Sequence, residues 1–142
     1  MKIMTCFIDT SAWLAILDKS DPHHNDARNY FEQLLEKDTK LVTNNIAIDE
    51  TINQLKIKSG AETARQFYNV IDESILTIQL RMDWISRRIR KNAVNHFLKS
   101  KEHELHLRHF FIFETIKRKH VDIIFTFDRA FRLFDLPLMP HA

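Results

Sequence analysis

Met4-Thr-Cys-Phe-Ile-Asp-Thr-Ser-Ala-Trp13 is the stretch that decides the fold of this chain. Its apolar residues 6–8 are typical of a buried strand, and they lead directly into Asp9. Thr10 and Ser11 are residue types that favour the start of a helix, and an amphipathic segment follows them. In open α/β sheets, ligand sites lie at the carboxyl ends of the strands. The stretch therefore predicts a strand, a helix and, between them, a carboxylate at a position suited to function.

The rest of the chain alternates short apolar runs with segments in which apolar residues recur at helical spacing. This alternation predicts a single domain, residues 1–142, with a three-layer α/β/α sandwich around a central parallel sheet. The expected strands cover residues 2–8, 40–43, 74–79, 121–127 and 136–139; the expected helices cover residues 11–17, 24–36, 46–58, 61–72, 82–98 and 109–120, with a short helix near residues 131–134.

The same spacing predicts which side chains face the core. On the helix over residues 61–72, Tyr68 is expected to point inward together with its apolar neighbours. The helix over residues 82–98 is expected to bury one line of side chains, formed by Ile85, Ile89, Ala93 and Phe97.

Composition excludes several classes of site. A single cysteine, Cys6, rules out an internal disulfide and a multi-cysteine zinc site, and its apolar surroundings predict a buried thiol. A single glycine, Gly60, rules out a glycine-rich phosphate loop. The sequence shows neither a signal peptide nor an apolar run of membrane-spanning length, so we expect a cytoplasmic protein without a membrane partner. A net charge of +2 permits a polyanionic partner without requiring one.

Three acidic residues stand where they could share a cation. Asp9 and Asp128 each end an apolar run, and the carboxyl ends of parallel strands meet at one edge of a sheet. Glu50 lies one turn into a helix that Asn44 or Asn45 can cap. Taken alone, each of these residues could instead be a helix cap, a turn former or a solvated side chain. Together they favour a site for a hard divalent ion such as Mg²⁺ or Mn²⁺, because clustered carboxylates need a compensating charge.

Four motifs carry a resemblance to a known family. They are Phe7-Ile-Asp9-Thr-Ser-Ala12, Asn45-Ile-Ala-Ile-Asp-Glu50-Thr, Leu105-His-Leu-Arg-His109 and Phe125-Thr-Phe-Asp128-Arg-Ala-Phe131. With these motifs the chain resembles the PIN domain over essentially its whole length, and within that family it is most similar to the small VapC-type toxins of toxin–antitoxin pairs.

The resemblance implies a Mg²⁺- or Mn²⁺-dependent ribonuclease. Asp9, Glu50 and Asp128 match acidic residues of the catalytic metal site, and Ser11 and Thr126 match polar neighbours that hold the carboxylates. An RNA substrate, a small antitoxin and a homodimer are the partners that the resemblance implies. Four aromatic side chains could serve such a partner or pack in the core: Trp13, Tyr30, Phe31 and Trp84.

One position departs from the family pattern. His109 stands where the family's third acid normally opens the helix before the last strand. A neutral imidazole could bind the metal and favour Mn²⁺. A protonated ring could contact RNA phosphate, although a helix N-terminus disfavours a cation. A third alternative is a site that no longer cuts, and a fourth is a histidine that only packs in the core.

Basic residues supply candidate RNA contacts. Arg87, Arg90 and Lys91 cluster on one expected helix, and Arg129 follows Asp128. They either contact phosphates or form solvated helix faces. Two alternatives to a nuclease stay open: a degenerate PIN domain that binds RNA or protein without cleaving, and a flavodoxin-like domain that accepts a phosphoryl group at Asp9.

Overall fold

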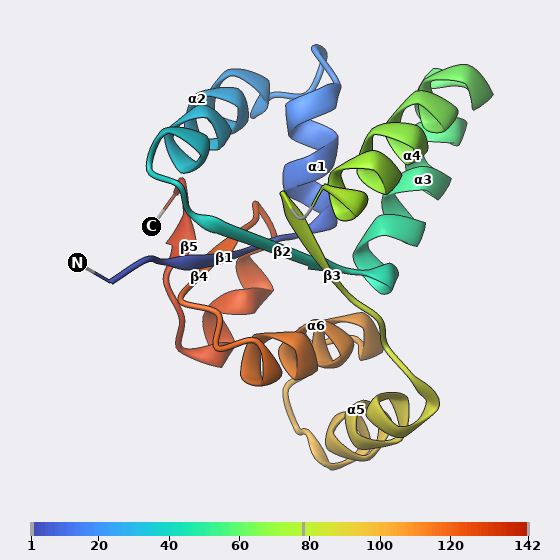
Figure 1. Ribbon diagram of the computed structural model, residues 1–142. Coiled ribbons are helices and arrows are strands. Elements are labelled where there is room, and N and C mark those ends of the chain that lie inside the picture. The colour runs from blue at the N-terminus through green and yellow to red at the C-terminus, as the bar shows by residue number, and fades with distance from the viewer. Residues whose placement is uncertain (1, 78, 142) are drawn as a thin grey trace.

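A five-stranded parallel sheet forms the centre of the molecule in the computed structural model, which describes residues 2–77 and 79–141 (Figure 1). Its strand order is β3-β2-β1-β4-β5, and all four neighbouring pairs are parallel. The strands are β1 (Thr5–Ile8), β2 (Lys40–Asn44), β3 (Leu80–Asp83), β4 (Ile123–Phe125) and β5 (Leu138–Met139).

Helices cover both faces of this sheet, which confirms the expected α/β/α sandwich (Figure 1). The layer on one face consists of α1 (Thr10–Leu17), α2 (His24–Glu36), α3 (Asn45–Ser59) and α4 (Ala61–Leu76). The layer on the other face holds α6 (Leu107–Arg118) and the 3₁₀-helix η1 (Arg129–Phe134), with α5 (Arg87–Lys99) packed on α6. No helix in the described part of the chain has both the length and the apolar character needed to cross a bilayer.

Strand β1 joins the two layers because successive side chains of a strand point to opposite faces. Cys6 and Ile8 pack with the residues of α1 to α4, whereas Phe7 packs with Ile112 and Ile116 of α6. The side chains of Cys6, Phe7 and Ile8 are fully buried. Burial raises the pKa of the Cys6 thiol to about 12, so the cysteine behaves as a small apolar residue.

The region between α4 and α5 corrects the sequence prediction. The strand expected over residues 74–79 is instead the end of α4 and a turn, and position 78 lies outside the described residues. The strand itself comes later, because residues 80–83 pair with residues 41–44 of β2. The helix expected from residue 82 therefore starts at Arg87, where the Ser86 hydroxyl accepts a hydrogen bond from the Ile89 N–H. Periodicity cannot place these boundaries, because a short apolar run fits a strand or a helix equally well.

One expectation about inward-facing residues is wrong, and another is confirmed in part. Tyr68 is half exposed on α4. Of the line expected on α5, Ala93 is buried, and Phe97 and Ile85, which precedes the helix, are partly exposed but pack against the same core cluster; Ile89 is partly exposed. The reason is that α5 packs on α6 in a second layer rather than on the sheet, so one narrow stripe is enough to cover its contact.

Candidate functional site

The backbone brings two of the predicted acids to one edge of the sheet. Asp9 follows β1 directly, and its N–H donates to the carbonyl oxygen of Phe125 in β4 at 3.0 Å. Asp128 follows β4 after two residues and begins η1, where its Oδ1 accepts from the Ala130 N–H at 3.0 Å. The parallel pairing of β1 and β4 therefore sets the two carboxylates beside each other.

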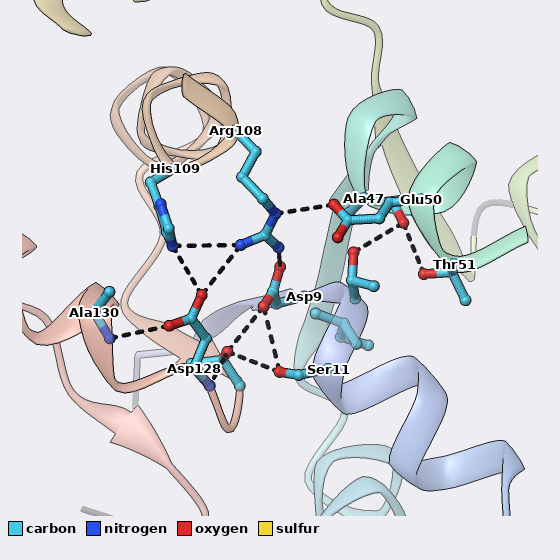
Figure 2. A network of polar contacts seen from close by, with 12 residues as sticks. Asp9, Ser11, Ala47, Glu50, Thr51, Arg108, His109, Asp128 and Ala130 are labelled. Atoms are coloured by element: carbon cyan, nitrogen blue, oxygen red, sulfur yellow. Dashed lines mark hydrogen bonds and ion pairs between the residues drawn. The ribbon is translucent and has the colours of Figure 1, made fainter. Parts of the chain in front are cut away.

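Helix α3 carries the third acid to the same edge. The Asn44 side chain at the end of β2 accepts a hydrogen bond from the Ala47 N–H at 2.9 Å, which starts the helix in a fixed direction. Glu50 lies half-buried in the second turn and faces the cluster, whereas the adjacent Asp49 is exposed. Figure 2 shows Asp9, Glu50 and Asp128 converging from three separate elements.

Two hydroxyl groups hold the fully buried Asp9 carboxylate. The Thr126 hydroxyl donates to Asp9 Oδ2 at 2.9 Å, and the Ser11 hydroxyl lies 3.3 Å from the same oxygen. Both hydroxyls are themselves fixed: Ser11 accepts from the Phe127 N–H at 2.9 Å, and Thr126 accepts from the Asp128 N–H at 3.0 Å. Oδ2 is thus occupied by protein donors, and only Oδ1 of Asp9 faces the centre of the cluster.

The sequence reasoning missed the residue at that centre, Arg108. Its three guanidinium nitrogens each contact a different carboxylate (Figure 2). Nη2 lies 2.8 Å from Asp9 Oδ1, Nε lies 2.9 Å from Glu50 Oε2, and Nη1 lies 3.1 Å from Asp128 Oδ2. The only signal in the sequence was a cation beside His109, inside the motif that departs from the family pattern.

Burial opposes the charge of Arg108, but the carboxylates of Asp9 and Glu50 outweigh that effect. The pKa of its guanidinium therefore lies above its ordinary value. The pKa of Asp128 falls to about 2, first because of the hydrogen bond from His109 and also because of the charge on Arg108. Asp128 is consequently ionised throughout the physiological pH range.

His109 is buried and uses both ring nitrogens. Helix α6 starts at Leu107, so His109 is its third residue, and its Nδ1 accepts a hydrogen bond from the His106 N–H at 2.8 Å. A ring that accepts at Nδ1 is neutral and carries its proton on Nε2. Nε2 lies 2.8 Å from Asp128 Oδ2 and donates to it. In this arrangement His109 orients Asp128 and has no lone pair directed at a metal.

The predicted RNA contacts lie outside the carboxylate cluster. Arg87, Arg90 and Lys91 are exposed on α5, where the Arg90 guanidinium carbon lies 5.3 Å from the centre of the Phe111 ring. Arg129 is exposed at the start of η1 and donates to the carbonyl oxygen of His141 at 2.8 Å. The four side chains stay accessible to a polyanion, and their role in RNA binding stays a prediction.

The cluster offers the carboxylate ligands that a divalent ion prefers, but in the present arrangement these ligands are not spaced to hold one. Convergent carboxylate oxygens are the ligands that Mg²⁺ and Mn²⁺ prefer. Within residues 2–77 and 79–141, however, no group of three or more His, Cys, Asp or Glu side chains is arranged to hold a metal ion. The guanidinium of Arg108 stands between the three acids and contacts each of them through a different nitrogen.

Comparison with solved structures finds the same fold in two toxin-related proteins. The toxin VapC20 of Mycobacterium tuberculosis, described as cleaving the sarcin–ricin loop, superposes with a TM-score of 0.78 at 20% identity, over 92% of this chain and 95% of that chain. VapBC2 of Rickettsia felis, solved bound to a DNA fragment from its promoter, gives a TM-score of 0.67 at 12% identity, over 95% of this chain and 97% of that chain. Comparison with curated protein sequences gives no match.

The family follows from the sequence profile. The family model of the PIN domain matches residues 6–136, a span that begins in β1, ends just after η1 and contains all three acids as well as Arg108 and His109. The chain therefore belongs to the PIN domain family.

Proposed function

We propose that this protein is a metal-dependent endoribonuclease and the toxin of a toxin–antitoxin pair. The observation that carries the proposal is the convergence of Asp9, Glu50 and Asp128 on one cation at the carboxyl edge of the sheet. Membership of the PIN family and the fold shared with a toxin that cleaves the sarcin–ricin loop support it.

Each part of this chemistry has a candidate residue in the chain. Asp9 and Asp128 would hold a Mg²⁺ or Mn²⁺ ion, and Glu50 would either hold the ion or orient water. Such an ion polarises a phosphate and lowers the pKa of bound water. Ser11 and Thr126 would keep Asp9 in place. Arg87, Arg90, Lys91 and Arg129 would contact the RNA backbone.

Metal dependence of RNA cleavage is the direct test. The purified protein is expected to cut RNA in Mn²⁺ or Mg²⁺ and to lose this activity in EDTA, because the acids alone cannot compensate the charge on a phosphate. Denaturing gels of a structured RNA and of an unstructured RNA measure the rate. If the protein binds RNA without cutting it under any of these conditions, the degenerate binding module is the correct reading of the site.

His109→Ala is expected to reduce cleavage by about 10- to 100-fold, the usual cost of losing an outer hydrogen-bond partner of a metal ligand. The variant leaves Asp128 without the donor at 2.8 Å that fixes its Oδ2. Single-turnover cleavage at saturating Mn²⁺ measures the effect. His106→Ala is the matched control: it retains the backbone N–H that donates to His109 Nδ1 and removes the exposed His106 ring, whose centroid lies 5.8 Å from that of the His109 ring. Equal rates for His109→Ala and wild type would contradict a role in positioning Asp128.

An antitoxin is the proposed protein partner, as the VapBC2 neighbour suggests. A pocket lined by Trp13 and Phe31 offers an apolar surface, and Leu35 and Val70 at its edge are more than half exposed. The other two aromatic candidates differ in exposure: Tyr30 is buried against Phe125, and Trp84 is exposed.

A further inference from the structure

We infer that Arg108 is a built-in competitor for the divalent ion, and that the ion binds by displacing its guanidinium. The inference rests on the proposed function, in which the three acids form a metal site. It concerns a residue of this chain that opposes metal binding rather than one that supports it.

The guanidinium and an ion would need the same three oxygen atoms. Arg108 contacts Asp9 Oδ1, Glu50 Oε2 and Asp128 Oδ2. The other oxygen of each carboxylate already accepts from a protein donor. These donors are the Thr126 hydroxyl for Asp9, the Gln54 amide at 3.2 Å for Glu50, and the Ala130 N–H for Asp128. No second set of oxygens faces the centre.

Distance makes the two cations mutually exclusive. The nitrogens of Arg108 lie 2.8, 2.9 and 3.1 Å from the carboxylate oxygens. Mg²⁺ requires oxygen ligands at about 2.0–2.1 Å in near-octahedral geometry. An ion at the centre would therefore overlap the guanidinium, and the acids would close in only after Arg108 had left.

Charge indicates that the form with Arg108 in place is a resting form. One guanidinium does not neutralise three carboxylates, and His109 adds no charge because its Nδ1 accepts a hydrogen bond. The remaining negative charge repels an RNA phosphate. A divalent ion would compensate more of this charge, so it is the better counter-ion when the substrate approaches.

The Arg108 side chain can also move away from the three carboxylates. The Arg108 side chain is 22% exposed, so it is not sealed inside the protein. It comes from the first turn of α6, and its long side chain can rotate without unfolding the helix. The 5.8 Å separation between its guanidinium carbon and the Phe131 ring adds only a weak further hold.

Arg108→Ala is expected to bind Mn²⁺ roughly tenfold or more tightly than wild type, within the usual range of coupling between two competing ligands. Isothermal titration with MnCl₂, and the loss of the free Mn²⁺ signal in electron paramagnetic resonance, measure the affinity without any RNA. Arg132→Ala is the matched control, because Arg132 forms an exposed ion pair with Glu104 outside the cluster and its loss should leave Mn²⁺ affinity unchanged. An affinity of Arg108→Ala equal to or below that of wild type overturns the inference.

Two further measurements cover a variant that folds poorly without metal. Arg108→Lys keeps one charge but carries all its donors on a single nitrogen, so it cannot reproduce the contacts that three separate guanidinium nitrogens make, and its Mn²⁺ affinity should lie between those of wild type and Arg108→Ala. The melting temperature of Arg108→Ala should rise more on adding Mn²⁺ than that of wild type, because the ion replaces the missing cation. Adding Asp9→Asn to Arg108→Ala should abolish the gain in affinity; a gain that persists would place the ion elsewhere and overturn the inference.

The Mn²⁺-affinity assay tests the competition by Arg108, and the cleavage assay tests the proposed nuclease, so either proposal can be contradicted while the other is supported. Tighter Mn²⁺ binding by Arg108→Ala, with no RNA cleavage by either protein, supports the competition and contradicts the proposed nuclease. Mn²⁺-dependent cleavage by wild type, with no tighter binding by Arg108→Ala, supports the nuclease and overturns the competition.

Discussion

RNA cleavage by the Asp9→Asn variant is expected to fall more than about 100-fold below wild type, beyond the usual cost of losing an outer partner of a metal ligand. Asp9 is the most deeply buried of the three acids and the only one fixed by two hydroxyl groups. An amide at this position offers no charge to a divalent ion, so the ion loses its best-oriented ligand.

The substitution should leave the fold intact. Asparagine has almost the same shape, its oxygen can still accept from Arg108, and its NH₂ group can donate to the Ser11 and Thr126 hydroxyls, which rotate to suit. Thermal unfolding of both proteins checks this. Asp49→Asn is the matched control, because this exposed acid neighbours Glu50 without facing the cluster. If Asp9→Asn, purified in parallel with wild type, cleaved RNA at the wild-type rate, the activity would not come from this site.

Arg118→Ala is expected to lower the free energy of unfolding by about 2 kcal/mol, within the range for leaving a buried acceptor without its partner, because Asp83 is buried whereas the Arg118 side chain is 37% exposed. Asp83 ends the edge strand β3 and is only 3% exposed. Both of its carboxylate oxygens accept from the Arg118 guanidinium, and the Thr115 hydroxyl donates to Oδ2 at 2.6 Å. Without Arg118 the buried carboxylate keeps only one donor.

Urea unfolding measures this effect as a lower midpoint at an unchanged slope. Arg132→Ala is the control, because its two-pronged contact with Glu104 is exposed and should contribute no more than about 1 kcal/mol. Replacing Asp83 and Arg118 together by leucine should cost less than Arg118→Ala alone, since no unpaired charge is then buried. If Arg118→Ala lost less free energy of unfolding than Arg132→Ala, the Asp83–Arg118 pair would not hold β3 to α6.

Local sequence patterns determined much of the secondary structure of this protein. The apolar run before Asp9 predicted a buried strand, and β1 contributes to the cores on both sides of the sheet. Helical periodicity located α2 and α3 closely, and Asn44 caps α3 as its residue type predicts. These features depend on neighbours in the chain, so the order of residues is enough to reveal them.

Only the tertiary structure decided where β3 lies and what occupies the centre of the site. Residues 80–83 are a strand because β2 is beside them, not because of their own pattern. Arg108 meets Asp9 across 99 positions of sequence and Glu50 across 58, and no local period relates such residues. The sequence showed three acids that need a cation. The fold supplied one from within the chain, because the first turn of α6 opens onto the edge of the sheet where the acids converge.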